Sequence, residues 1–237
     1  MKTTARRIIP ILLAAFALSA CASLPPLKPL DPTLKTSVQE GCRRPFLFSK
    51  FRLVHALDTV LPDGKKGTAI GILVADPRTG RFQTALITLE GLVLFSAESG
   101  EALVVNRAVP PFDSSEFARS LAEDIRLAFF SPGEEPLAWG REEGGSLVCR
   151  FGRPDGGFVD VSTADGGVIE ICLYGAGQDV RKMVKIPSLE KPGLAEILEI
   201  RSQGRRSYTL RLRLIESEAL ETEPGSPLGG AAPGANH

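Results

Sequence analysis

Apolar and polar residues alternate with a period of two over most of residues 51–109, and turn signals interrupt the alternation. These signals are Asp63-Gly64, Thr79-Gly80, Glu90-Gly91 and Glu98-Ser99-Gly100. The pattern predicts five strands in hairpin succession, and strands joined by short hairpins pair antiparallel. The chain is therefore restricted to folds built on an antiparallel sheet.

A second group of about six strands is predicted after residue 133. Asp155-Gly156-Gly157 and Asp165-Gly166-Gly167 each precede a strand-like run, and we interpret them as hairpin turns and not as calcium-binding glycine repeats. The last strand alternates most clearly. Its two faces are Tyr208, Leu210, Leu212 and Leu214 on one side, and Thr209, Arg211 and Arg213 on the other. We interpret the arginine face as solvated and not as an anion site.

One amphipathic helix is predicted between the two groups of strands. Pro110-Pro111-Phe112 ends the first group, and Asp113 with Glu116 three residues later forms a capping-box pattern. The apolar stripe contains Phe117, Leu121 and Ile125, and we expect it to cover a sheet face because such a stripe must be buried. The predicted fold class is α+β, with an antiparallel sheet of about eleven strands under one main helix and short helices.

The N-terminus has the anatomy of a secretory signal. Lys2, Arg6 and Arg7 precede an apolar run over residues 8–18. The run is shorter than the about 20 residues that a membrane-spanning helix needs. An ordinary secretory signal with a chance cysteine at its end is one interpretation of this segment, and it is the less favoured one.

Leu18-Ser19-Ala20-Cys21 resembles the lipobox of bacterial lipoproteins. The resemblance implies a diacylglycerol thioether on Cys21 and an acyl group, such as palmitate, on its amine. Several long chains would hold the protein firmly on a membrane. Ala22 and Ser23 come next without an Asp, which by resemblance to the enterobacterial sorting rule implies the outer membrane, with the domain facing the periplasm.

The sequence predicts four segments. Residues 22–36 contain several prolines and favour an extended tether of about 3.1 Å per residue, followed by a short helix over residues 37–42. The expected segments are a signal peptide at 1–20, the lipidated cysteine and tether at 21–47, the folded domain at 48–218 and a disordered tail at 219–237.

Composition excludes several classes of site. Without the three basic residues of the signal, 25 Lys and Arg face 28 Asp and Glu, so nucleic-acid binding is not expected. Cys42, Cys149 and Cys172 allow at most one intramolecular disulfide, and we favour buried free thiols for Cys149 and Cys172. With no C-x-x-C pair, no metal site or cofactor is expected.

No catalytic constellation is predicted. His55 is the only histidine outside the tail and lies within a strand, so we expect a packed or surface side chain. Glu123 and Asp124 lie on the polar side of the helix and are expected to be solvated. No nucleophile elbow, phosphate loop or dinucleotide motif is present, and an enzyme is the least favoured function.

The element order resembles that of the outer-membrane lipoprotein-sorting proteins of the LolA/LolB type and related lipoproteins. The resemblance covers about residues 48–218 and rests on Gly91-Leu92-Val93-Leu94-Phe95, Pro110-Pro111-Phe112 and the final strand. It implies a strongly curved, open half-barrel whose apolar cavity receives acyl chains. It also implies that Phe117, Leu121 and Ile125 form a lid over that cavity.

A loop in the LolB branch of this family carries an exposed leucine thought to touch the membrane. The matching residues here are Leu89 and Leu92, but Glu90 lies between them. Placing a carboxylate in an apolar layer is costly, so we expect a tight turn between two strands and not a membrane probe.

The sequence supports two candidate functions. The first is a monomeric outer-membrane lipoprotein that binds acyl chains or lipoproteins as cargo and takes part in their localisation. The second is a structural or assembly lipoprotein with a filled core, which acts through protein contacts.

Overall fold

The computed structural model describes residues 24–60, 64–189, 191–204 and 207–221. The predicted signal peptide, Cys21 and residues 222–237 lie outside these ranges. The strands are β1 (Phe51–Val60), β2 (Lys66–Asp76), β3 (Arg81–Ile87), β4 (Val93–Ser99), β5 (Leu103–Ala108), β6 (Ala138–Arg141), β7 (Leu147–Gly152), β8 (Phe158–Thr163), β9 (Ile169–Tyr174), β10 (Val180–Ile186), β11 (Ile197–Ser202) and β12 (Tyr208–Ala219). The helices are η2 (Pro32–Leu34), α2 (Lys35–Arg43) and α3 (Ser115–Phe129).

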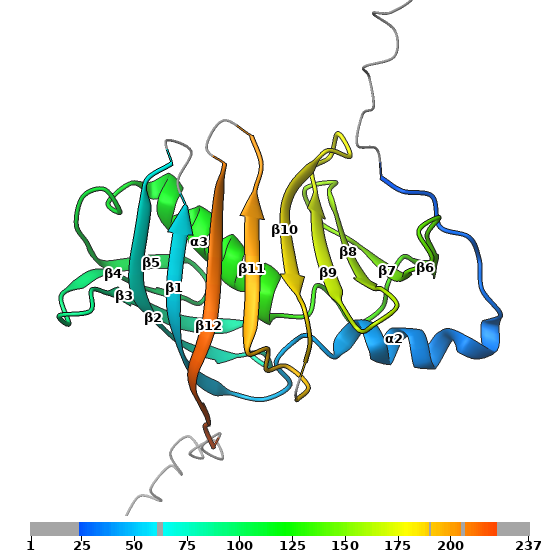
Figure 1. Ribbon diagram of the computed structural model, residues 1–237, viewed down its shortest axis with the longest axis horizontal. Coiled ribbons are helices and arrows are strands. Elements are labelled where there is room, and N and C mark those ends of the chain that lie inside the picture. Colours follow the sequence, from blue (N-terminus) through cyan, green and yellow to red (C-terminus); the bar gives the residue numbers. More distant parts are fainter. Residues whose placement is uncertain (1–23, 61–63, 190, 205–206, 222–237) are drawn as a thin grey trace, which may run out of the picture.

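The strands form one sheet in the order β5-β4-β3-β2-β1-β12-β11-β10-β9-β8-β7-β6, antiparallel throughout. The sheet does not close, and it curls around α3 (Figure 1). The predicted fold class is confirmed. The strand beyond the expected eleven is β6, whose four residues are too few to show a clear alternation.

The core lies on the face of the sheet that carries both α-helices, called here the inner face. Residues aligned across neighbouring strands form a continuous buried row along it. That row is Cys149, Val161, Ile171, Val184, Ile200 and Leu210, from β7 to β12. The strands alternate buried and partly exposed positions, as expected for a sheet with one covered face. In β12, Leu210 and Leu212 are buried and Arg211 and Arg213 are exposed, which confirms the predicted faces.

The helix α3 begins one residue later than the capping-box pattern predicts. Ser114 is the N-cap, and its hydroxyl accepts a hydrogen bond from the Phe117 N–H at 3.1 Å. Asp113 therefore is not the cap, because Ser114 has the extended backbone of an N-cap residue and its side-chain oxygen accepts from the first turn. None of the described helices is long and apolar enough to cross a membrane.

The segment before β1 is joined to the domain. Helix α2 packs on the inner face, and Cys42 forms a disulfide with Cys149 of β7. Val38, Phe46 and Leu47 are also buried in the core. Residues 35–47, which the sequence assigns to the tether, therefore belong to the folded domain. The free thiol expected at Cys149 is wrong.

Candidate functional site

The predicted lid residues of α3 all face the sheet. The Phe117 ring makes edge contacts with Phe95 of β4 and with Phe112, at centroid distances of 5.2 and 5.1 Å. Ile125 is buried, and Leu121 is partly buried against the core. The helix therefore covers the inner face with the stripe that its sequence spacing indicates.

A small cavity lies between α3 and strands β1–β3, β11 and β12. Its volume is about 40 Å³. The α3 residues that line it are Leu121, Asp124, Ile125 and Phe129, and the strands contribute His55 and Thr84 among mostly aliphatic side chains. Small-ligand pockets occupy roughly 300–1,000 Å³. The cavity beneath α3 is therefore several times smaller than such a pocket.

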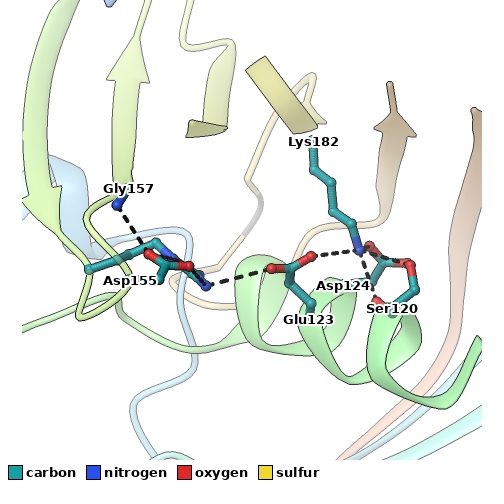
Figure 2. Close-up of polar contacts among 7 residues, drawn as sticks. Ser120, Glu123, Asp124, Asp155, Gly157 and Lys182 are labelled. Atoms are coloured by element: carbon teal, nitrogen blue, oxygen red, sulfur yellow. Dashed lines mark hydrogen bonds and ion pairs between the residues drawn. The ribbon is translucent and has the colours of Figure 1, made fainter. Parts of the chain in front are cut away.

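A buried polar cluster joins α3 to the inner face (Figure 2). The Lys182 ammonium of β10 donates to the Asp124 carboxylate at 2.6 Å and to the Ser120 carbonyl at 2.9 Å, and it lies 3.2 Å from a Glu123 carboxylate oxygen. The Tyr208 hydroxyl of β12 donates to the other Asp124 oxygen at 2.5 Å. Two strands thus bind one turn of the helix.

The cluster corrects the expectation that Asp124 is solvated. Asp124 is 4% exposed and Lys182 is 5% exposed. Burial raises the pKa of Asp124, and the attraction of Lys182 and the hydrogen bonds from Lys182 and Tyr208 offset part of that rise. Removing one member of a buried ion pair leaves an uncompensated charge, so the cluster fixes where α3 sits.

The cluster continues to the outside of the domain. Arg153, in the turn between β7 and β8, lies 3.6 Å from the Glu123 carboxylate, and it also pairs with Asp155 at 3.0 Å. The Asp155 carboxylate accepts from the Gly157 N–H at 3.1 Å, as the dashed lines in Figure 2 show. A line of charges therefore runs from buried Lys182 to an exposed hairpin turn.

Arg126, in the last turn of α3, makes a second set of contacts with the sheet. The Arg126 guanidinium donates to the Ser99 hydroxyl of β4 at 2.8 Å. It also lies over the Phe82 ring at 5.6 Å and the Phe130 ring at 6.0 Å. Together with the Lys182 contacts, these bonds fix α3 to both halves of the sheet.

His55 lies at the floor of the cavity, in β1. Its ring is 3% exposed and packs against Phe129 at a centroid distance of 5.7 Å. Burial lowers the pKa of His55 to about 4. The side chain is therefore a neutral, packed imidazole at neutral pH, and packed is one of the two environments that the sequence predicts.

The remaining described cysteine, Cys172, is a free thiol on the outer face of β9. Burial raises its pKa to about 12, so the thiol stays protonated and unreactive. This confirms the free thiol predicted at Cys172. No group of His, Cys, Asp and Glu side chains suited to a metal ion occurs among the residues that the structure describes.

Leu89 and Leu92 lie at the tight turn between β3 and β4. The Gly91 N–H donates to the Thr88 carbonyl at 3.0 Å, and the Thr88 N–H donates to the Leu92 carbonyl at 2.9 Å. Gly91 has φ = +89°, a value that favours glycine. Leu89 is 68% exposed and Leu92 54% exposed. The hydrogen bond from Thr88 lowers the pKa of Glu90, which keeps a charge at the turn.

Comparison with known proteins identifies the architecture. No protein-family model matches the sequence. No characterised protein matches it either. The LolA superfamily protein NE2245 from Nitrosomonas europaea matches in structure with a TM-score of 0.50 and 9% identity, over 79% of this chain and 94% of that one. The chain has a LolA-like fold. At 9% identity, the similarity of the LolA-like domain to that protein concerns the fold alone.

Proposed function

We propose that this chain is a lipoprotein anchored in the outer membrane through Cys21, whose LolA-like half-barrel receives acyl chains of a lipid or lipoprotein between the sheet and α3. The observation that carries the proposal is the apolar part of the inner face that α3 covers. Polar contacts confined to few residues hold that helix in place. Breaking them would expose a concave apolar surface, which is the usual form of a small-ligand site.

In this proposal, the structure with α3 packed against the sheet is that of the protein without cargo. An acyl chain would take the place of Leu121 and Ile125 against the sheet, and the helix would move outward. The Lys182–Asp124 contact would then break or rearrange, so cargo binding and this ion pair would compete.

Mass spectrometry of acyl species that co-purify with the mature domain, expressed without its signal peptide and Cys21, tests cargo binding. Leu121→Trp should fill the cavity and remove the bound species. Arg119→Trp is the matched control, because Arg119 is exposed on the same helix and should leave binding unchanged. Loss in both variants, or in neither, would contradict a site beneath α3.

The Cys21→Ser change in cells tests the anchor. It should release the protein from membranes or leave it as unprocessed precursor. A variant that is processed and stays in the outer membrane would contradict lipidation at Cys21.

The turn at Leu89 is proposed to have no part in membrane contact, because Glu90 lies beside it. Leu89→Glu and Leu92→Glu should fold and transfer a lipidated cargo to liposomes as the wild type does. Folded variants that lose only the transfer would identify the turn as a membrane probe.

A second candidate function is a structural or assembly lipoprotein without cargo. The cavity of only about 40 Å³ favours it, because the core is nearly filled. A purified domain that carries no acyl species and does not bind a fluorescent fatty acid would select this candidate over the first.

A further inference from the structure

The N-terminal segment of residues 24–34, called here the strap, is docked on the β6 edge of the sheet. Lys28 and Arg141 of β6 exchange two backbone hydrogen bonds of 2.8 and 2.9 Å. The Arg150 guanidinium of β7 donates to the Pro25 carbonyl at 2.8 Å while it also holds Asp160 through two bonds. The extended tether that the prolines predict is thus held against the sheet over these residues.

The fit between the strap and β6 is close. A Cβ atom on Gly140 would lie 2.5 Å from the Lys28 carbonyl oxygen, so only glycine leaves room for the strap there. Beyond the edge, Leu30 packs against the core, and α2 then lies on the inner face. Figure 1 shows the strap running past β6 to α2.

Docking leaves a short connection to the proposed anchor. Only Ala22 and Ser23 lie between Cys21 and Leu24, the first described residue, so the two ends are three residue steps apart. Even a fully extended chain of that length spans at most about 10 Å. A lipid on Cys21 would therefore hold the β6 edge close to the membrane surface, while β5 lies at the opposite end of the sheet.

The surface beside the docked strap is apolar. Residues 136–139, called here the β6 strip, read Pro-Leu-Ala-Trp, and Leu137 is the most exposed large apolar side chain among the described residues, at 71%. The Leu137 N–H donates to the Arg150 carbonyl at 2.7 Å, so the strip and the strap share Arg150. Trp139 is half-buried against the core, and tryptophan is enriched at membrane interfaces.

The β6 strip differs from the β3–β4 turn in the neighbours of its exposed leucine. Pro136 and Ala138 flank Leu137, and the exposed Glu135 is two residues away, whereas Glu90 follows Leu89 directly. Placing Leu137 in the interfacial layer therefore brings no adjacent carboxylate with it.

We propose that the docked strap orients the domain with the β6 strip in the outer-membrane interface, so that Leu137 contacts lipid. The inference rests on the lipid anchor at Cys21 in the proposed function. The partner is a lipid surface, because the short connection from Cys21 brings the strip to the membrane that holds the anchor. The open β5 edge and the β3–β4 turn then point away from the anchored edge.

The test is tryptophan quenching in the complete lipidated protein. Trp139 is the single tryptophan of the chain, so Trp139→Phe gives a silent background. In that background Leu137→Trp reports on the strip, and Leu89→Trp is the matched control at the other exposed leucine. Each protein is reconstituted in phosphatidylethanolamine and phosphatidylglycerol vesicles with brominated acyl chains.

We expect strong quenching and a blue-shifted emission for the tryptophan at position 137, and little change for the one at 89. A flexible Gly-Ser spacer of about twelve residues before Leu24, which spans roughly 20 Å, should reduce quenching at 137. The inference would be overturned by equal quenching at both positions, by no quenching at 137, or by quenching at 137 that the spacer does not reduce.

The mass of the N-terminal peptide separates this inference from the proposed function. A lipidated Cys21 with an unquenched tryptophan at 137 would overturn the orientation alone. An unmodified Cys21 would overturn the orientation and the proposed anchor together. Acyl cargo beneath α3 is measured separately and depends on neither result.

Discussion

Acid should destabilise the domain through His55. Its folded pKa of about 4 lies below the ordinary value of 6.5, because burial disfavours the charged ring. Below pH 6.5 the unfolded chain binds a proton at this residue and the folded chain does not. Stability is therefore lost as the pH falls from about 6.5 toward 4. Linkage gives a loss of about 2 kcal/mol between pH 7.5 and pH 5.0 from this group.

Urea unfolding of the wild type and of His55→Leu, each at pH 7.5 and pH 5.0, measures this contribution. The raised pKa of Asp124 acts in the opposite direction, because a folded state that holds its proton gains stability as the pH falls. Both proteins contain Asp124, so the difference between them isolates His55. The variant should lose about 2 kcal/mol less than the wild type on acidification. Equal losses would refute the account of His55 as a buried neutral ring.

Three further changes should alter the free energy of unfolding in urea. Lys182→Met should cost about 3–5 kcal/mol because it strands the Asp124 charge, and adding Asp124→Leu should restore most of the loss; no recovery would contradict a buried ion pair. Cys42→Ser opens a link across a sequence separation of 107 and should cost about 4–5 kcal/mol. Cys172→Ser is its control and should have little effect. Leu121→Ala should cost about 2 kcal/mol, the low end for such a truncation, because the side chain is only partly buried beside a cavity; a loss near 5 kcal/mol would contradict that.

Local periodicity predicts the parts of this fold that each strand or helix determines alone. The alternation in β12 indicates which residues face inward, and the spacing of Phe117, Leu121 and Ile125 identifies the buried side of α3. Both patterns indicate which side of an element is buried, whichever other element covers that side.

The polar cluster could not be predicted in this way. Asp124 lies at the border of the α3 stripe, where spacing alone does not separate a buried position from a solvated one. Its partner Lys182 lies in β10, and nothing in the sequence around Lys182 indicates a contact with α3. The Cys42–Cys149 pairing has the same cause, since it depends on α2 reaching the inner face of β7. The local signal of such a cluster is a lysine, Lys182, that alternates with the apolar residues Val184 and Ile186 on the inward side of its strand.

The pairing of the first and last strands has a consequence for biogenesis. Phe51 of β1 pairs with Ala219 of β12, so the two halves of the sheet join only through residues near the C-terminal end of the described chain. Until that strand has been synthesised, β1 and β11 are both free edges, which readily pair with other chains. Long-range pairing of this kind also folds slowly. The two halves of the sheet are therefore expected to keep an unpaired edge each, at β1 and at β11, until β12 is available to pair with both.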